Sequence, residues 1–160
     1  MSKEKIIAIV AGALALLLIA TGLFFILKPA KVPTAQIGEE ISIPLELKTN
    51  PGIAAGDITV EYDTDNLVFV SAKGNEKFEV DSTVQDNGKV RCILVFSGAA
   101  ENSKMTGELL NLKFRVKDTA EPGEYTLKVG NDSKFANIDE KWVECKFKES
   151  KFEIKEKTKK

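Results

Sequence analysis

The chain has 160 residues, with 23 basic and 24 acidic side chains, a net charge of −1, no histidine and two cysteines. This charge balance provides no overall positive field for binding nucleic acid. The absence of histidine removes the usual general base near neutral pH and the commonest transition-metal ligand, which argues against most enzyme and metal-site classes. Cys92 and Cys145 form no CxxC motif, so they are either one disulfide or two buried thiols.

The N-terminal part predicts a membrane anchor. Residues 1–5 form a short polar head, and residues 6–27 are a run of 22 residues without a charge. About 20 apolar residues cross the roughly 30 Å hydrocarbon layer, whereas the apolar region of a signal peptide is usually about 7–15 residues long. No small-x-small cleavage site or lipid-anchoring cysteine follows. We expect a single retained transmembrane helix.

The orientation of this helix is less well determined, because lysines flank the run on both sides. A five-residue head is consistent with a cytoplasmic N-terminus and an extracellular domain. The expected protein is therefore a single-pass membrane protein. Residues 28–36 are expected to be a linker, since Pro29 and Pro33 discourage helix continuation.

Residues 41–47 give the first strand pattern, because Ile and Leu alternate there with polar residues. Pro44 lies inside this run and cannot donate a ladder hydrogen bond. We therefore expect the strand to lie at a sheet edge or to contain a bulge at Pro44.

Residues 51–72 contain two strand patterns and the corner between them. Residues 57–62 alternate polar and apolar, which predicts a half-buried strand. The polar corner of residues 63–66 could offer calcium ligands, but turn chemistry alone explains Asp and Asn there, and no metal site is expected. Residues 67–70 are apolar on both faces, so this second strand is expected to be deeply buried.

Strand patterns continue to the end of the domain. Residues 73–85 are mostly polar and predict a poorly paired strand, and Asn87-Gly88 predicts a hairpin turn. Residues 89–97 alternate, with Val90, Cys92, Leu94 and Phe96 on one face and Arg91, Ile93 and Val95 on the other. Further alternating runs cover 110–116, 125–129, 143–147 and 152–154, with a polar connection anchored by Phe135, Ile138 and Trp142 and a basic tail at 155–160.

The pattern as a whole predicts an all-β fold. After residue 27 there are about eight or nine short alternating runs bounded by Gly, Pro, Asn or Asp, and there is no helical period. We expect an antiparallel, jelly-roll-like β-sandwich over residues 37–154, with alternate residues of two sheets buried against each other.

These runs also resemble a known family. The Pro-Gly entry, the strand ending in Tyr-Asp, the polar corner and the Leu-x-Phe-Val-x-Ala strand of residues 51–72 are similar to the third and fourth strands of cohesin modules, the receptors of cellulosome scaffold proteins. The likeness continues through KVRCILVFSG, GELLNLKFRVKD, AEPGEYTLKVG and SKFEIK, from Val32 to Ile154. It implies a non-catalytic module that docks a small helical protein partner, the dockerin, and needs no cofactor.

The resemblance also implies a site on the outward face of the third and sixth strands. Asp57 matches an acidic contact position of the family, and Val95 matches an aliphatic one. The candidate partner-binding residues are Asp57, Thr59, Glu61, Arg91, Ile93 and Val95. The loop that follows departs from the family, because it reads Ser97, Gly98, Ala99, Ala100 and Glu101 where many cohesins place an acidic residue and a glycine after the strand. Alternatively, Ile93 and Val95 are ordinary strand residues covered by residues 73–85.

Two other functions are weaker alternatives. A surface sandwich that binds a glycan, or forms a structural part of the cell envelope, is the second hypothesis, but glycan sites usually need rows of exposed aromatic rings and Trp142 is the sole tryptophan. Catalysis has the least support, because neither a carboxylate pair nor a G-x-S-x-G nucleophile motif is present.

Overall fold

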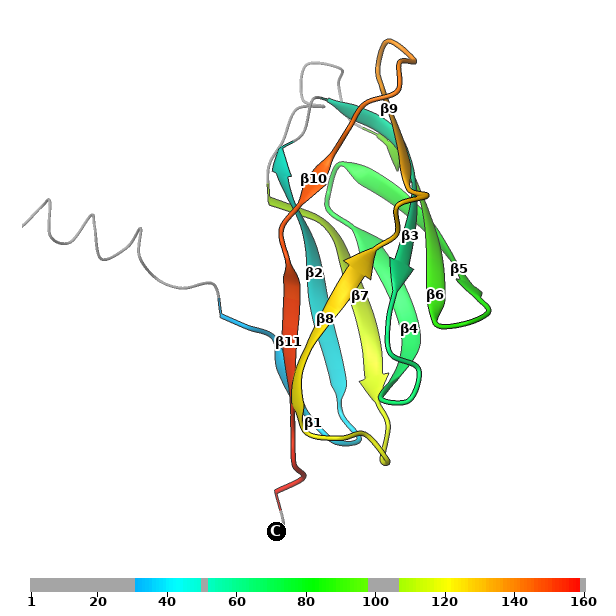
Figure 1. The fold of residues 1–160 in the computed structure, drawn as a ribbon. Coiled ribbons are helices and arrows are strands. Elements are labelled where there is room, and N and C mark those ends of the chain that lie inside the picture. The colour runs from blue at the N-terminus through cyan, green and yellow to red at the C-terminus, as the bar shows by residue number, and fades with distance from the viewer. Residues whose placement is uncertain (1–30, 50–51, 98–106, 159–160) are drawn as a thin grey trace, which may run out of the picture. The chain divides into compact units, whose positions relative to one another are not determined.

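Strands form the fold of this chain from Thr34 to Lys155 (Figure 1). The structure is a computed structural model that describes residues 31–49, 52–97 and 107–158. Its strands are β1 (Thr34–Gln36), β2 (Glu40–Thr49), β3 (Ile53–Glu61), β4 (Leu67–Gly74), β5 (Phe78–Gln85), β6 (Lys89–Phe96), β7 (Gly107–Val116), β8 (Gly123–Val129), β9 (Lys134–Asn137), β10 (Lys146–Phe147) and β11 (Ser150–Lys155).

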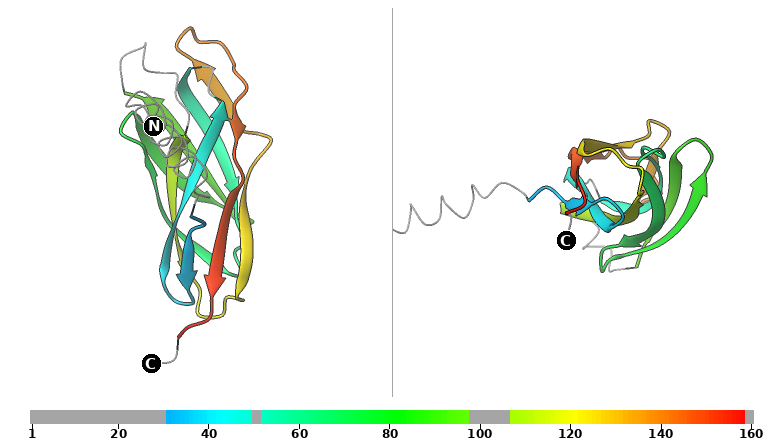
Figure 2. Two further views of the ribbon diagram at one scale, coloured as in Figure 1. Left: turned by 90° about the vertical axis from the view of Figure 1, so that its left-hand side faces the viewer. Right: turned by 90° about the horizontal axis from the view of Figure 1, so that it is seen from below.

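The strands form two sheets that face each other (Figure 2). The larger, seven-stranded sheet has the order β1-β11-β8-β3-β6-β5, and β9 pairs with β3 beside that path. The smaller, four-stranded sheet has the order β10-β2-β7-β4. Among the described strands, β1 and β11 pair in parallel and all other pairs are antiparallel. The predicted all-β sandwich is confirmed, but with eleven described strands instead of about eight or nine, and with one parallel pair in an otherwise antiparallel arrangement.

The core lies between the sheets and is built from the alternate residues that the sequence pattern predicted. Ile58, Leu94, Phe114 and Leu127 come from four different strands and belong to one buried cluster. Phe114 lies at its centre, with ring centroids 5.0 Å from Tyr62 and 5.7 Å from Phe69. Burial of so many apolar side chains, each worth about 1.5–3 kcal/mol, is the main force that joins the sheets.

The sandwich begins earlier in the chain than expected. β1 occupies Thr34–Gln36, inside the segment 28–36 expected to be a linker, and Ala35 is buried. Pairing with β11 explains the difference, because Thr34 lies opposite Glu153 and Gln36 lies opposite Lys155. Three residues are too few to show an alternating pattern, so β1 has no signal of its own in the sequence.

The predicted transmembrane helix of residues 6–27 lies outside the described residues. Within residues 31–49, 52–97 and 107–158 the structure contains no helix with the length and hydropathy needed to cross a membrane.

β4 is not the deeply buried strand that its sequence predicted. It forms the edge of the four-stranded sheet, and Val68 and Val70 are 47% and 45% exposed. A register shift between Phe69 and Ser71 interrupts its pairing with β7. Leu67 and Phe69 point toward the core, where the Phe69 ring contacts Phe114, so Val68 and Val70 point to the outer face of the sheet, and this explains their exposure.

β5 is also different from its prediction, because it is a regular strand. All eight of its residues pair with β6, from Phe78 opposite Phe96 to Gln85 opposite Lys89. The hairpin turn between them is confirmed, since Asn87 and Gly88 have φ values of 63° and 72°. Gly88 also accepts a hydrogen bond from Tyr62, at 2.9 Å between N and O, which ties the hairpin to the end of β3.

Pro44 is accommodated only partly as the sequence predicted, because β2 is not an edge strand and its bulge does not fall at Pro44 itself. It lies opposite Asn111 of β7, while β10 pairs only with the far end of β2, at Leu47 and Thr49. A register shift follows Pro44, between Leu45 and Glu46. The missing N–H therefore falls where β2 has a strand partner on one side only.

Candidate functional site

The outward face of β3 and β6 is assembled by antiparallel register. Ala55 lies opposite Val95, Asp57 opposite Ile93, and Thr59 opposite Arg91. Directly opposed residues of an antiparallel pair point to the same side of the sheet. The structure therefore brings the six residues predicted from the sequence onto one face, with Ile58 and Cys92 of the same strands buried on the other.

Ile93 and Val95 are exposed on this face, toward its Val95 end. Their exposed fractions are 38% and 54%, although β6 is flanked on both sides by other strands. The alternative expectation, that residues 73–85 cover them, is wrong, because β5 lies beside β6 in the same sheet. The backbone of β6 is paired on both sides. At Ile93 and Val95 the strand therefore presents apolar side chains to solvent and no free backbone hydrogen-bonding groups.

Asp57 and Arg91 form a bidentate ion pair next to these apolar residues. Arg91 Nε donates to Asp57 Oδ1 at 2.7 Å, and Nη2 donates to Oδ2 at 2.5 Å. The hydrogen bond from Arg91 is the main cause that lowers the pKa of Asp57, although partial burial opposes it. The pair is partly exposed and holds both side chains flat across the two strands.

A second ion pair extends the polar border. Lys89 Nζ lies 3.1 Å from Glu61 Oε1, with both side chains partly exposed. Glu61 and Lys89 are directly opposed across β3 and β6, at the opposite end of the face from Val95. The face thus has an apolar part at the Val95 end and a charged part at the Glu61 end.

Thr59 differs from the expectation of an accessible contact residue. It is only 5% exposed, because the turn from Gly130 to Ser133, between β8 and β9, lies over it. Thr59 N donates to Ser133 Oγ at 3.1 Å, and Thr59 Oγ1 donates to Asp132 Oδ2 at 3.2 Å. Both β8 and β9 pair with β3, and the gap between them falls at Thr59. Strand parity placed Thr59 on the correct side but could not reveal this cover.

β5 adds two acidic residues that the sequence reasoning did not include. Glu79 lies opposite Val95 and Asp81 lies opposite Ile93, so both are on the same outward face. Both are exposed, and neither forms an ion pair with another described residue. They were missed because the segment was expected to be poorly paired. The signal that could have found them is the alternation of Glu79, Asp81 and Thr83 with Val80, Ser82 and Val84.

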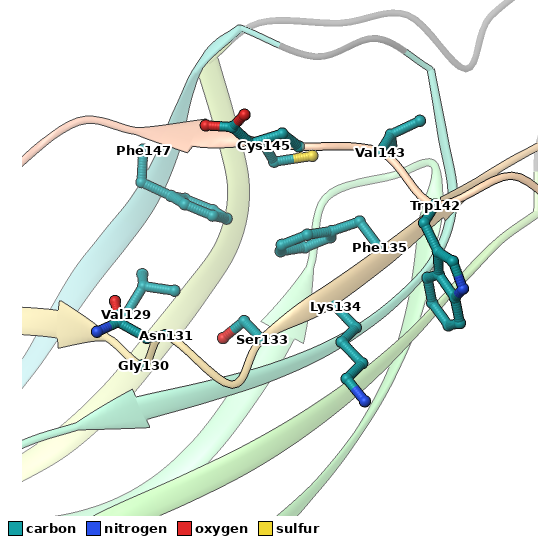
Figure 3. A pocket seen from close by; sticks show the side chains of 11 residues that line it. Val129, Gly130, Asn131, Ser133, Lys134, Phe135, Trp142, Val143, Cys145 and Phe147 are labelled. Carbon is teal, nitrogen blue, oxygen red and sulfur yellow. The ribbon is translucent and has the colours of Figure 1, made fainter.

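A cavity of about 780 Å³ lies between the start of β9 and the segment from Trp142 to Phe147 (Figure 3). Its lining is mixed polar and apolar, and it includes the rings of Phe135 and Phe147, whose centroids are 5.7 Å apart at an interplanar angle of 42°. Trp142 stands at the rim and is 76% exposed. The other residues that line the cavity are Val129, Gly130, Asn131, Ser133, Lys134, Val143, Glu144 and Cys145.

Both cysteines are free thiols, which resolves the alternative left open by the sequence. Burial raises the pKa of Cys92 to about 11. Burial, and to a smaller degree the charge of Glu144, raises the pKa of Cys145 to about 11. The thiolate is the nucleophilic form of cysteine, so both side chains act as small packing groups near neutral pH.

The polar corner at residues 63–66 is explained by turn chemistry. Asp63 Oδ1 accepts from the backbone N of Asp65 at 2.8 Å, and Asp63 Oδ2 accepts from Asn66 Nδ2 at 2.7 Å. The Asn66 side-chain oxygen in turn accepts from Glu121 N at 2.7 Å. The part of the chain that the structure describes contains no cluster of three or more potential metal ligands.

Comparisons with known proteins identify the fold. The family model of the cohesin domain matches residues 27–154. No curated protein matches the chain. The sixth cohesin of Acetivibrio cellulolyticus scaffoldin B, solved in complex with a Cel5 dockerin mutant, has a TM-score of 0.65 and 18% identity, and the match covers 78% of this chain and 95% of that one.

Two further structures are similar at comparable levels. The Coh-OlpA–Doc918 complex, a type I cohesin–dockerin complex of Clostridium thermocellum, matches with a TM-score of 0.60 and 22% identity, over 77% of this chain and 96% of that one. The non-cellulosomal cohesin of the archaeon Archaeoglobus fulgidus matches with a TM-score of 0.56 and 16% identity, over 77% and 88% of the two chains. At these identities the structures report on the fold.

Proposed function

Because this chain belongs to the cohesin domain family, we propose that it is a non-catalytic module that docks a dockerin-type protein partner on the outward face of β3 and β6. This surface, called the docking face below, consists of Asp57, Glu61, Arg91, Ile93 and Val95. The observation that carries the proposal is the exposure of Ile93 and Val95, at 38% and 54%, on a strand in the interior of its sheet.

The docking face has the composition of a protein interface. Its apolar part, Ile93 and Val95, is bordered toward the Glu61 end by the Asp57–Arg91 and Glu61–Lys89 ion pairs and on the β5 side by Glu79 and Asp81. Interfaces typically have such an apolar core and polar rim, and an apolar patch bordered by polar residues marks an interaction site. The bidentate pair holds the long side chain of Arg91 against Asp57, which lowers the entropic cost of ordering it when a partner binds.

The solved relatives support a protein partner of this kind. The Acetivibrio cellulolyticus and Clostridium thermocellum cohesins were each solved with a dockerin. The archaeal relative is described as non-cellulosomal. The proposal therefore concerns a dockerin-bearing partner and does not require that partner to be a cellulose-degrading enzyme.

We further propose that residues 6–27 anchor the protein in a membrane with the cohesin domain outside the cell. The support is the run of 22 residues without a charge, which matches the thickness of a bilayer. Protease added to intact cells should degrade the cohesin domain while a cytoplasmic marker protein survives. Protection of the domain under those conditions would contradict the orientation, and release of the protein by alkaline carbonate would contradict the anchor.

Affinity capture with the whole chain tests the docking proposal. The detergent-solubilised protein should retain a dockerin-bearing protein from the lysate of its own organism, and the double variant Ile93→Lys/Val95→Glu should lose it. The matched control is Val68→Lys/Val70→Glu on β4, where two valines of similar exposure lie on the other sheet. Equal capture by both double variants would contradict the docking face. Retention on insoluble polysaccharide without a protein partner would favour the glycan hypothesis.

A further inference from the structure

One row of small and apolar residues runs across the docking face and continues beyond it. Val95 of β6 lies opposite Ala55 of β3, and Ala55 lies opposite Ala136 of β9. Ala136 is in turn bridged to Trp142 in the next segment of the chain. These four residues therefore form a line across four neighbouring chain segments, on the same side of the sheet.

The two residues at the ends of the row have larger side chains than the two alanines between them. Val95 and Trp142 are 54% and 76% exposed. Between them, Ala55 is exposed and Ala136 is half-buried, and each contributes only a methyl group. A valine on one side and an indole on the other thus enclose a shallow floor of backbone and methyl groups.

The indole of Trp142 is on the docking-face side of β9. Lys134 lies opposite Asp57, a residue of that face. In Figure 3 the side chains of Lys134 and Trp142 extend to one side of β9, while Phe135 extends to the other, toward Phe147. Phe135 is buried, and Trp142 stands in solvent.

The segment that carries Trp142 has a defined backbone. Asn137 N donates to Lys141 O at 2.9 Å, and Val143 N donates to Phe135 O at 3.0 Å. The Asn137 side-chain oxygen accepts from Asp139 N at 3.0 Å and from Lys141 N at 2.9 Å. Trp142 is therefore presented at a fixed position, and binding a partner there costs little ordering of the chain.

The dimensions of the row indicate its occupant. Neighbouring strands are about 4.8 Å apart, so the three steps from Val95 to Trp142 span about 14 Å. An α-helix with its side chains is about 10–12 Å across. A helix fits between Val95 and Trp142 with its axis along β3 and β9, whereas an extended strand would leave most of the width empty.

Accepting the proposed docking function, we propose that Val95, Ala55, Ala136 and Trp142 form a trough for one α-helix of the partner, with Trp142 as its second wall. The helix places small or apolar side chains over Ala55 and Ala136. Beyond the Val95 wall, the exposed carboxylates of Glu79 and Asp81 favour basic side chains on the partner. Trp is among the residues that contribute most when buried in an interface.

Tryptophan fluorescence tests this trough directly, because the chain contains a single tryptophan. The probes are purified dockerin modules without tryptophan, encoded by the same organism and titrated one at a time against the whole chain. Binding should shift the emission of Trp142 to shorter wavelength and reduce its quenching by acrylamide. Trp142→Ala should raise the dissociation constant at least ten-fold, and Ala55→Arg, which fills the floor, should do the same.

Ile138→Ala is the matched control, since Ile138 lies in the same short segment, is 48% exposed and is not part of the row. Its dissociation constant should stay within two-fold of the wild-type value. If no dockerin binds the wild-type chain, the proposed function and the trough are both overturned. If a dockerin binds but the emission does not shift, or Trp142→Ala binds as tightly as Ile138→Ala, the trough alone is overturned.

Discussion

β4 and β6 each expose two β-branched side chains, yet they do so in different surroundings. On β4, Val68 and Val70 lie at the edge of the smaller sheet, beside a bulge. On β6, Ile93 and Val95 lie on a strand that is paired on both sides and is bordered by ion pairs. The exposed fractions are similar, but of the two strands only β6 presents these side chains from a backbone that is paired on both sides.

This difference indicates what each strand does. A bulged, twisted edge is one of the ways in which proteins prevent strand-to-strand association. An interior strand has no free backbone groups to protect, so exposed apolar side chains there are available for a side-chain-mediated interface. Six substitutions, in four experiments, test whether β4 and β6 share a core and differ only in their surfaces.

The largest expected effect comes from the shared core. Phe114→Ala removes a fully buried side chain of β7 that contacts Phe69 of β4, and Leu94→Ala removes a fully buried side chain of β6. We expect a loss of about 3–5 kcal/mol in the free energy of unfolding for Phe114→Ala and about 2–5 kcal/mol for Leu94→Ala. Urea unfolding followed by circular dichroism measures both. A single transition that shifts for each variant supports one core, whereas two separate transitions would show that the sheets unfold independently.

The next largest loss of stability is expected to be confined to the hairpin formed by β5 and β6. Gly88 has a φ of +72°, and a Cβ at this position would lie 2.6 Å from the carbonyl oxygen of Tyr62. We expect Gly88→Ala to destabilise the protein by about 1–3 kcal/mol. Hydrogen exchange should accelerate in β5 and β6 and remain unchanged in β4. Equal acceleration in both regions would contradict a local origin.

A smaller effect, dependent on pH, is expected for Asp57→Asn. Because the hydrogen bond from Arg91 lowers the pKa of Asp57, the pair contributes stability above the unfolded pKa of about 3.9 and loses it as the pH falls through the folded value. Wild type should be more stable than Asp57→Asn at pH 6, and the difference should vanish at low pH. A difference that grows as the pH falls would contradict this assignment.

The smallest effect is expected on β4. Val70→Lys replaces a half-exposed side chain at a bulged edge, where the side chain has few packing neighbours to lose. Substitutions at such positions usually change stability by no more than about 0.5 kcal/mol. Urea unfolding followed by circular dichroism measures this effect, and the same measurement on Ile93→Lys should also show little change. The two variants should differ only in partner binding.

The sequence predicted the fold where side-chain alternation was enough to determine it. Ile58, Leu94 and Phe114 were assigned to the core by parity, and Ile93 and Val95 to the outward face, because alternate residues on a strand point to opposite sides. Parity does not reveal whether the outer face of a sheet is covered by other parts of the chain. For that reason Val68 and Val70 were expected to be buried and are not.

The candidate site was only partly predictable for a related reason. Thr59 was assigned to the correct side of β3, but its burial depends on where β8 ends and β9 begins along that strand. The row that ends at Trp142 depends on three separate strand registers. Registers between segments distant in the sequence are set by tertiary packing, so no local pattern around Trp142 could indicate its neighbours.

The parallel pairing of β1 with β11 has a mechanical consequence. The chain enters β1 at Thr34, opposite Glu153, and leaves β11 at Lys155, opposite Gln36. Tension between the two ends would drag these strands past each other along their length. Their hydrogen bonds, such as Glu153 N to Pro33 O at 2.9 Å and Ile37 N to Lys155 O at 3.1 Å, would then bear the load together rather than open one after another. Unfolding under force is governed by the rate of such a rupture. The pairing of β1 with β11 should therefore increase the resistance of the domain to unfolding when it is pulled by its two ends.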